Sequence, residues 1–198
     1  EVRAAGGLRL PRRRRAVTLA GTVRFPGGGQ VSTKGRPMSG AAIHLLVGTT
    51  KGTFVLDGDA ERLHWRVRGP YCDGWPINHV IGDPVTGTMW AGGGGDWSGA
   101  GVWCSRDRGH TWELSKLTSG EVDAWAARDP GFAESIGWVE APAPFGDGFS
   151  QVWSLGRTGG RLYAGTKPAT LLVSDDDGQT WETVKGLTDH PSAAQWGP

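Results

Sequence analysis

Short apolar, β-prone stretches alternate with polar, glycine-rich loops along most of this chain. Such alternation predicts β-strands joined by turns rather than helices, because the apolar runs are short and are bounded by Gly, Pro, Asp and Ser. The stretches lie at 45–49, 79–84, 88–92, 102–103, 151–155, 161–166 and 171–173. We therefore expect an all-β fold built from many short strands.

Two of the loops share the octapeptide Ser-x-Asp-x-Gly-x-Thr-Trp, at 105–112 and 174–181, 69 residues apart. Each copy lies between two apolar runs, which predicts a hairpin. The Asp can accept hydrogen bonds from loop N–H groups, and the Gly can supply a positive φ. The Thr returns the chain to β geometry, and the Trp fills the space beneath the turn. We assign a structural role to the ten fixed residues Ser105, Asp107, Gly109, Thr111, Trp112, Ser174, Asp176, Gly178, Thr180 and Trp181.

A degenerate copy precedes Trp65, at 57–64, without the Ser and the Gly in register. Gly48, Gly92 and Gly165 precede the three repeat tryptophans at comparable distances, so the whole unit repeats and not only the turn. A further strand precedes the last two units, at 79–84 and 151–155. Four antiparallel strands per unit are typical of a β-propeller blade.

The octapeptide resembles the Asp box of BNR repeats, which are found in sialidases and many other β-propellers. Further strings strengthen the resemblance, among them Leu-Tyr-Ala-Gly-Thr from 162 and Leu-Thr-Asp-His-Pro from 187. Over about 43–196 the chain is similar to a bacterial family of sialidase-like propellers usually labelled glycosyl hydrolases or BNR repeat-containing proteins. The resemblance implies a partial β-propeller of four-stranded antiparallel blades, with Asp-box turns at the outer rim, away from the active site.

The repeat accounts for two full blades and one partial blade, whereas closed propellers have about four to eight. We expect a fragment of a longer protein; the alternative is a ring that closes by oligomerisation. The longer step between the last two units predicts an insertion at about 116–148, with one short helix around 121–128.

Charge divides the chain into two parts. Residues 1–37 hold nine Lys or Arg and one Glu, while the remainder holds twelve basic and nineteen acidic residues. The four arginines at 12–15 suit either a tail that binds nucleic acid or an extension outside the fold. Because Met38 stands just before the first strand, we favour a mis-called start: a disordered basic extension at 1–37, with the propeller at 38–198. The acidic remainder gives no electrostatic reason to expect nucleic-acid binding.

Targeting signals are not evident in the sequence. The apolar stretch at 16–20 is too short for a secretory signal, and no run reaches the length of a membrane span. Cys72 and Cys104 are too few for a disulfide scaffold and match no zinc spacing. We expect a cytoplasmic protein without a membrane partner.

The candidate catalytic and ligand-binding residues lie in three loops, at 69–79, 140–151 and 186–196, which we expect at the mouth of the propeller channel. The catalytic candidates are His79, Asp189 and His190, which suit an acid/base set or a divalent-metal site; the ligand-binding candidates are Gln151 and Trp196. Glu140 and Asp147 are further carboxylates in reach of such a site. The alternative is that all of these groups only hydrogen-bond the connecting loops. No metal ligand is assigned.

A sialidase needs an arginine triad for the sialate carboxylate and a Tyr activated by a Glu. The string at 23–26 departs from the family's first arginine motif at two positions, and no further Arg or Tyr–Glu pair can be assigned. The resemblance therefore favours a propeller that binds or hydrolyses a glycan or another small polar ligand, without support for exo-sialidase activity. The alternative is a non-catalytic scaffold or protein-binding module.

Overall fold

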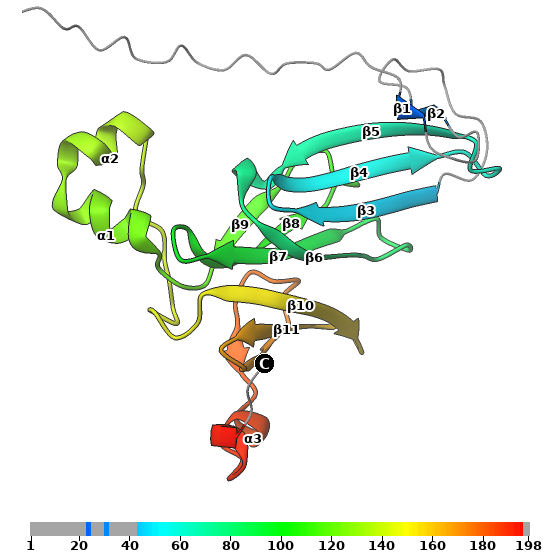
Figure 1. Ribbon diagram of the computed structural model, residues 1–198. Helices are drawn as coiled ribbons and strands as arrows, with labels where there is room; N and C mark the ends of the chain where they lie inside the picture. The colour runs from blue at the N-terminus through cyan, green and yellow to red at the C-terminus, as the bar shows by residue number, and fades with distance from the viewer. Residues whose placement is uncertain (1–22, 25–29, 32–42, 196–198) are drawn as a thin grey trace, which may run out of the picture.

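The computed structural model describes residues 23–24, 30–31 and 43–195, and within them the chain is built mainly of β-sheet. Three sheets follow one another along the chain and are stacked face to face (Figure 1). In the first sheet the strands β3, β4 and β5 are antiparallel, and the two-residue strands β1 and β2 lie beyond β5. Their bounds are β1 Val23–Arg24, β2 Gln30–Val31, β3 Ile43–Thr49, β4 Gly52–Gly58 and β5 His64–Tyr71.

The second and third sheets are four-stranded antiparallel meanders in which chain order equals spatial order. The second consists of β6 Ile77–Gly82, β7 Met89–Gly95, β8 Gly99–Ser105 and β9 Glu113–Lys116. The third consists of β10 Gln151–Thr158, β11 Arg161–Lys167, β12 Leu171–Ser174 and β13 Glu182–Thr183. The predicted all-β class is confirmed, and each octapeptide joins the last two strands of its sheet, as the sequence predicts.

The core lies between the second and third sheets, because alternate side chains of a strand point to opposite faces. Trp90 and Val102 from the second sheet pack there with Val152, Leu162 and Leu172 from the third, and all five are at most 1% exposed. The first sheet packs on the other face of the second, where Val55 is fully buried. The second sheet is therefore covered on both faces.

Glycines allow this close stacking. A Cβ on Gly92 would lie 2.6 Å from the side chain of Val152, the second residue of β10. A Cβ on Gly48 would lie 2.7 Å from the carbonyl of Ile77, the first residue of β6, and 2.9 Å from its side chain. Each glycine thus makes room for an aliphatic residue at the start of the next sheet.

The segment between the second and third sheets forms two helices, α1 Glu121–Arg128 and α2 Pro130–Ile136. The predicted helix at 121–128 is confirmed, whereas α2 is not predicted from the sequence. The backbone N–H groups of Glu121 and Val122 donate to the carbonyls of Asp96 and Trp97, at 2.9 and 3.0 Å. These bonds attach the start of α1 to the turn between β7 and β8.

Three shorter elements complete the described chain: the 3-10 turns Cys72–Gly74 and Ala193–Gln195, and the single helical turn α3 Lys185–Thr188. None of the helices in the described ranges is long and apolar enough to cross a membrane. The basic run at 12–15 and the ligand candidate Trp196 lie outside the described residues. Within 1–37 only the short strands β1 and β2 are described, at the edge of the first sheet, and the interpretation of this stretch as an extension stays a prediction.

Candidate functional site

The two octapeptide turns share one hydrogen-bond pattern centred on the aspartate. Asp107 accepts from the Thr111 amide at 2.9 and 3.0 Å, from the Thr111 hydroxyl at 2.7 Å and from the His110 amide at 2.9 Å. The hydroxyl of Ser105 donates to the same carboxylate and accepts from the Gly109 amide, both at 2.8 Å. The second turn repeats these contacts on Asp176.

Both carboxylates are held ionised by these bonds. The amide and hydroxyl of Thr111 hold the pKa of Asp107 well below its usual value. Burial alone would raise the pKa of Asp176, but the Thr180 hydroxyl and amide outweigh it and lower that pKa to about 2. Because their oxygens are occupied by the turn itself, the two aspartates are poorly placed to bind a substrate.

The degenerate copy before Trp65 reaches the same arrangement with different residues. Asp59 accepts from the Leu63 amide at 2.8 Å and from the His64 amide at 3.2 Å, and its carboxylate lies 2.6 Å from Nδ1 of His64. His64 directly precedes Trp65, as Thr precedes Trp in the other copies, but it lies five residues after its Asp, whereas the Thr lies four after. Arg62 has the positive φ, 58°, and its carbonyl accepts the Trp65 indole N–H at 3.1 Å.

Each octapeptide turn also binds the sheet that precedes it. The indole N–H of Trp90 donates to the carbonyl of Asp177 at 2.8 Å. The guanidinium of Arg68 donates to the carbonyls of Arg108 and Gly109 at 2.9 and 3.1 Å. The turns therefore connect neighbouring sheets as well as closing their own hairpins.

His79, a catalytic candidate, makes a hydrogen bond between two sheets. Its Nδ1 accepts the Leu155 backbone N–H at 2.8 Å, which in the neutral ring leaves the proton on Nε2. Beside it, the Asn78 side-chain amide donates to the Val152 carbonyl at 3.0 Å. The starts of β6 and β10 are thus held side by side.

A group of polar and aromatic side chains gathers where these two strands begin. Oε1 of Gln151 accepts the Trp153 indole N–H at 2.6 Å and lies 3.5 Å from Nδ2 of Asn78. Nζ of Lys167 lies 5.1 Å from the centroid of the Trp153 ring, and Trp153 is 45% exposed. We call Asn78, Gln151, Trp153 and Lys167 the first-strand cluster.

Sequence reasoning found one member of this cluster, Gln151. Asn78 and Trp153 lie at irregularities in the pairing of β6 and β10, between Ile77 and His79 and between Val152 and Ser154. An extra residue in a strand re-aims its side chain, and no sequence motif marks such a position. The two irregularities nevertheless lie at the same place, near the start of the first strand of each sheet. Because both strands belong to the same repeat unit, the repeat itself is a signal that relates Asn78 to Trp153.

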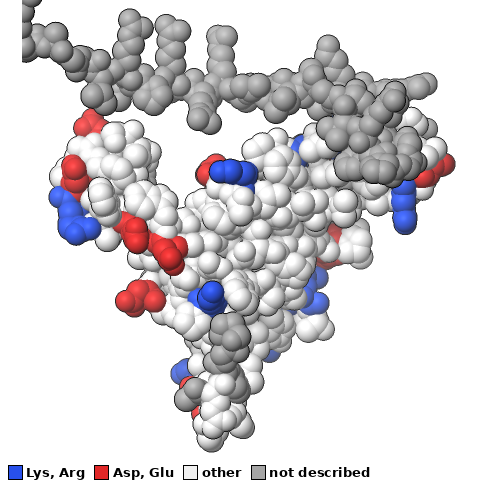
Figure 2. Space-filling view, in the orientation of Figure 1, with Lys and Arg blue, Asp and Glu red and all other residues white. Residues whose placement is uncertain are grey.

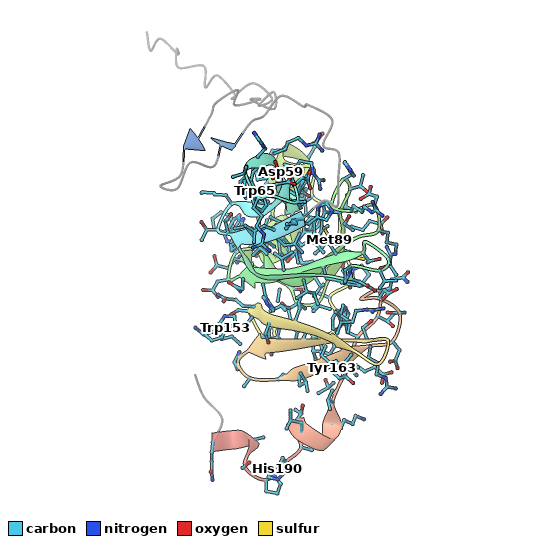
Figure 3. The ribbon with its side chains drawn as sticks, turned by 90° about the vertical axis from the view of Figure 1, so that its right-hand side faces the viewer. Asp59, Trp65, Met89, Trp153, Tyr163 and His190 are labelled. Atoms are coloured by element: carbon cyan, nitrogen blue, oxygen red, sulfur yellow. The ribbon has the colours of Figure 1, made fainter. Side chains whose placement is uncertain are left out.

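The other candidates lie elsewhere. Asp189 and His190 follow α3, which extends beyond the third sheet on the side away from β6, and Nδ1 of His190 lies 2.8 Å from the Ser192 hydroxyl (Figures 1 and 3). Glu140 and Asp147 are exposed residues of the long insertion. In the part of the chain that is described, no three His, Cys, Asp or Glu side chains are grouped to hold a metal ion, so the geometry lends no support to a metal site.

Two grooves lie between the sheets, and neither is lined by His79, Asp189 or His190. A groove of about 520 Å³ lies between β9, the second octapeptide turn and a proline-rich stretch at 141–144. A groove of about 420 Å³ lies between the first and second sheets and is lined in part by His44, Asp83 and Arg108. The described candidates therefore line neither of these two grooves.

Comparison with known proteins gives no assignment: no protein-family model matches the chain, and no curated protein matches it.

Proposed function

We propose that the three sheets are consecutive blades of a sialidase-like β-propeller and that the chain binds a glycan or another small polar ligand at the first-strand cluster. The repeated contact between sheets supports the propeller, because both Gly48 and Gly92 receive the first strand of the next sheet. In such an arrangement β6 and β10 would be neighbouring inner strands, and their starts would face the channel mouth.

The observation that carries the ligand proposal is the convergence of Asn78, Gln151, Trp153 and Lys167 from neighbouring strands. A half-exposed indole offers a flat apolar face to a sugar ring, and amide groups can donate to and accept from its hydroxyls. The Lys167 ammonium adds a positive charge beside the indole, which suits a ligand that also carries a carboxylate.

Binding fits the cluster better than hydrolysis does. Glycoside hydrolysis uses a pair of carboxylic residues or an equivalent nucleophile and acid, whereas the cluster consists of amide, indole and ammonium groups. His79 lies next to Asn78, but its Nδ1 already accepts the Leu155 amide. We therefore propose a binding role for this part of the propeller.

Titration of the full chain with N-acetylneuraminate, N-acetylglucosamine and glucose tests this proposal, read by tryptophan fluorescence and calorimetry. We expect saturable binding of at least one sugar, with a preference for the carboxylated one. Trp153→Ala should weaken that binding at least tenfold, and Lys167→Gln should remove the preference for N-acetylneuraminate.

The matched control is Trp97→Ala, since Trp97 is 51% exposed on the β7–β8 turn and lies outside the cluster. It should lower the fluorescence and leave the affinity unchanged. Equal loss of affinity in the Trp97 and Trp153 variants, or no saturable binding of any of the three sugars, would contradict the proposal.

A second candidate function, a protein-binding module, is favoured by the helical insertion. The rings of Trp97, Trp125 and Phe132 lie 6.1 to 6.5 Å apart, and both tryptophans are about half exposed. Figure 2 shows acidic side chains over α1 and α2, a setting that suits a basic partner. Binding of a lysine-rich peptide that is lost in Trp125→Ala would support this function, and its absence would remove it.

A further inference from the structure

Three aromatic rings form a corner where the helical insertion meets the second sheet. Trp97 lies on the turn between β7 and β8, Trp125 on α1 and Phe132 on α2. Their ring centroids lie 6.1 to 6.5 Å apart, and their planes are inclined to one another by 60 to 78°. We call these three residues the aromatic corner. Rings inclined this steeply do not stack, so each can present a face to the same space.

Backbone hydrogen bonds hold all three residues of the aromatic corner in place. The Trp97 carbonyl accepts from the Val122 amide, and the Trp125 carbonyl accepts from the Asp129 amide, both at 3.0 Å. The Asp129 carboxylate in turn accepts from the Phe132 amide at 3.0 Å. The aromatic corner is therefore held ready before a ligand arrives, which lowers the entropic cost of binding.

The spacing of the rings suits one small cation. Ring centres at this spacing, with planes near right angles, can all lie about 4.5 Å from a single point, which is inside the limit of about 6 Å for cation–π attraction. Trp97 and Trp125 are about half exposed and Phe132 is partly buried. The cation–π contacts of the described residues are made elsewhere, by Arg157 and Lys167. Among those residues, the aromatic corner thus has no cation of its own.

The charge around the aromatic corner also favours a cation. Residues 121–140 hold five acidic residues and one basic residue, Arg128. Lys116 of β9 lies against one of the five, with its Nζ 2.6 Å from the Asp123 carboxylate. Five acidic and two basic side chains leave a net charge of −3 in and beside the insertion. Figure 2 shows acidic side chains over both helices, and such a field attracts a positively charged ligand.

The aromatic lining selects a methylated cation over a primary ammonium. A primary ammonium is strongly hydrated and needs hydrogen-bond acceptors when it leaves water. Indole N–H groups only donate, and a phenyl ring has no conventional acceptor. A quaternary ammonium has no N–H to satisfy, and its methyl groups can pack on the ring faces while the charge interacts with the aromatic quadrupoles.

We propose that the aromatic corner binds the quaternary ammonium head group of a small ligand of the choline type. The two grooves described above do not reach these rings, so they cannot seat the chain on either side of a methylated lysine. All three rings come from 97–132, a stretch that ends before the third sheet begins. The proposal goes beyond the sugar site, and it shares its rings with the second candidate function without needing a protein partner.

Titration of the full chain with choline tests the proposal, read by calorimetry and by the proton NMR signal of the choline methyl groups. We expect saturable binding and an upfield shift of that signal, because protons above an aromatic face are shielded. The uncharged analogue of the same shape, 3,3-dimethyl-1-butanol, should bind at least about fivefold more weakly, since it lacks the cation–π attraction. Ethanolamine, the unmethylated amine, should also bind at least about fivefold more weakly.

Substitution of each ring shows where choline binds. Trp97→Ala, Trp125→Leu and Phe132→Leu should each weaken choline binding by about fivefold or more, and Trp125→Phe, which keeps a ring, should weaken it less than Trp125→Leu. Ile136→Ala is the matched control and should leave the affinity unchanged, because Ile136 is a half-exposed apolar residue of α2 outside the aromatic corner. Circular dichroism must show a folded chain, and any one ring variant that folds suffices for the comparison.

Several results would overturn the proposal. One is the absence of saturable choline binding up to about 20 mM, a concentration that reveals even a very weak site. Others are equal affinity for 3,3-dimethyl-1-butanol, or unchanged affinity in the folded ring variants. A trimethyl-lysine peptide that binds more than about tenfold tighter than choline would overturn the assignment to a small ligand.

The proposal and the second candidate function can fail separately. A lysine-rich peptide that binds when choline does not removes the quaternary ammonium site and leaves the protein-binding module. Choline binding without peptide binding supports the site and removes the module. The sugar titration depends on Trp153 and Lys167, which lie outside the aromatic corner, so its outcome is independent of both.

Discussion

The indole N–H of Trp90 donates to the backbone carbonyl of Asp177, which lies 87 residues further along the chain, at 2.8 Å. Asp177 is the first of two consecutive positive-φ residues in the second octapeptide turn, followed by Gly178, and Trp90 is fully buried in the preceding sheet. The bond therefore connects two sheets through a turn that repeats in the sequence. Arg157 adds to the contact, with its guanidinium carbon 5.4 Å from the Trp90 ring centroid and one nitrogen 3.1 Å from Asp83.

Removal of this bond should lower stability by about 1 kcal/mol, the usual net value of one hydrogen bond, with a further loss from the smaller ring. Trp90→Phe is the change, and urea denaturation is the measurement. Trp97→Phe is the matched control, because that indole is 51% exposed and should change the free energy of unfolding little. Equal effects of the two substitutions would contradict the role given to the Trp90 indole.

The contact between Gly92 and Val152 predicts a large cost for one added carbon. Gly92→Ala would place a Cβ 2.6 Å from Cγ1 of Val152 and should destabilise the chain by about 1–3 kcal/mol through overpacking. Gly156→Ala in β10 is the control, because its Cβ would meet nothing within 4 Å. Denaturant midpoints that move equally for both would show that the sheets do not approach as closely as described.

Acid should weaken the second octapeptide turn. The folded pKa of Asp176, about 2, lies below the ordinary value of about 3.9, so its stabilisation is present above about pH 4 and is lost as the pH falls toward 2. Asp176→Asn should therefore flatten the fall in unfolding free energy between pH 4 and pH 2.5. Asp147→Asn, a change at an exposed position, should leave that fall as in the wild type; an unchanged slope in the Asp176 variant would contradict the assignment.

Much of the fold could be predicted from the repeated octapeptide. The conformation of a turn depends on the types of the few residues within it, and these can be seen in the sequence. The hairpins at 105–112 and 174–181 and the helix at 121–128 are where the sequence predicts them. The helix α2 is missed because Pro130 and Gly131 at its start read as a loop. In the structure Pro130 occupies the first helical turn, where no N–H is needed, and Asp129 caps it by accepting from Phe132 at 3.0 Å. The propeller itself stays a proposal.

The candidate site is less predictable, because it depends on which strands become neighbours. His79 and Gln151 hold equivalent places before two strands in the sequence, and the structure does hold those strands side by side. The sequence gives no sign that the His79 ring accepts a backbone amide 76 residues away. Loop equivalence predicts that Asp189 and His190 lie near His79, yet the segment that follows β13 extends past the third sheet and places His190 away from it (Figure 3).

The hydrogen bond on His79 predicts which residues can replace it. Asn places an oxygen near the position of Nδ1, so His79→Asn should keep most of the stability, whereas His79→Ala should lose about 1 kcal/mol or more because the Leu155 amide is left unpaired. Hydrogen exchange at the Leu155 amide is the direct readout. Equal protection of the Leu155 amide in the wild type and the Ala variant would contradict this hydrogen bond and would leave the His79 ring available for catalysis.

Methyl contacts across the sheets test the central claim, that each sheet receives the next at an equivalent glycine. In a nuclear Overhauser spectrum of the full chain, the Val152 methyls should contact the Gly92 Hα protons, and the Ile77 γ2-methyl should contact those of Gly48. Both contacts together would show one packing geometry repeated along the chain. Absence of both contacts, or methyl contacts of Val152 and Ile77 with unrelated partners, would contradict the repeat stacking and every proposal built on it.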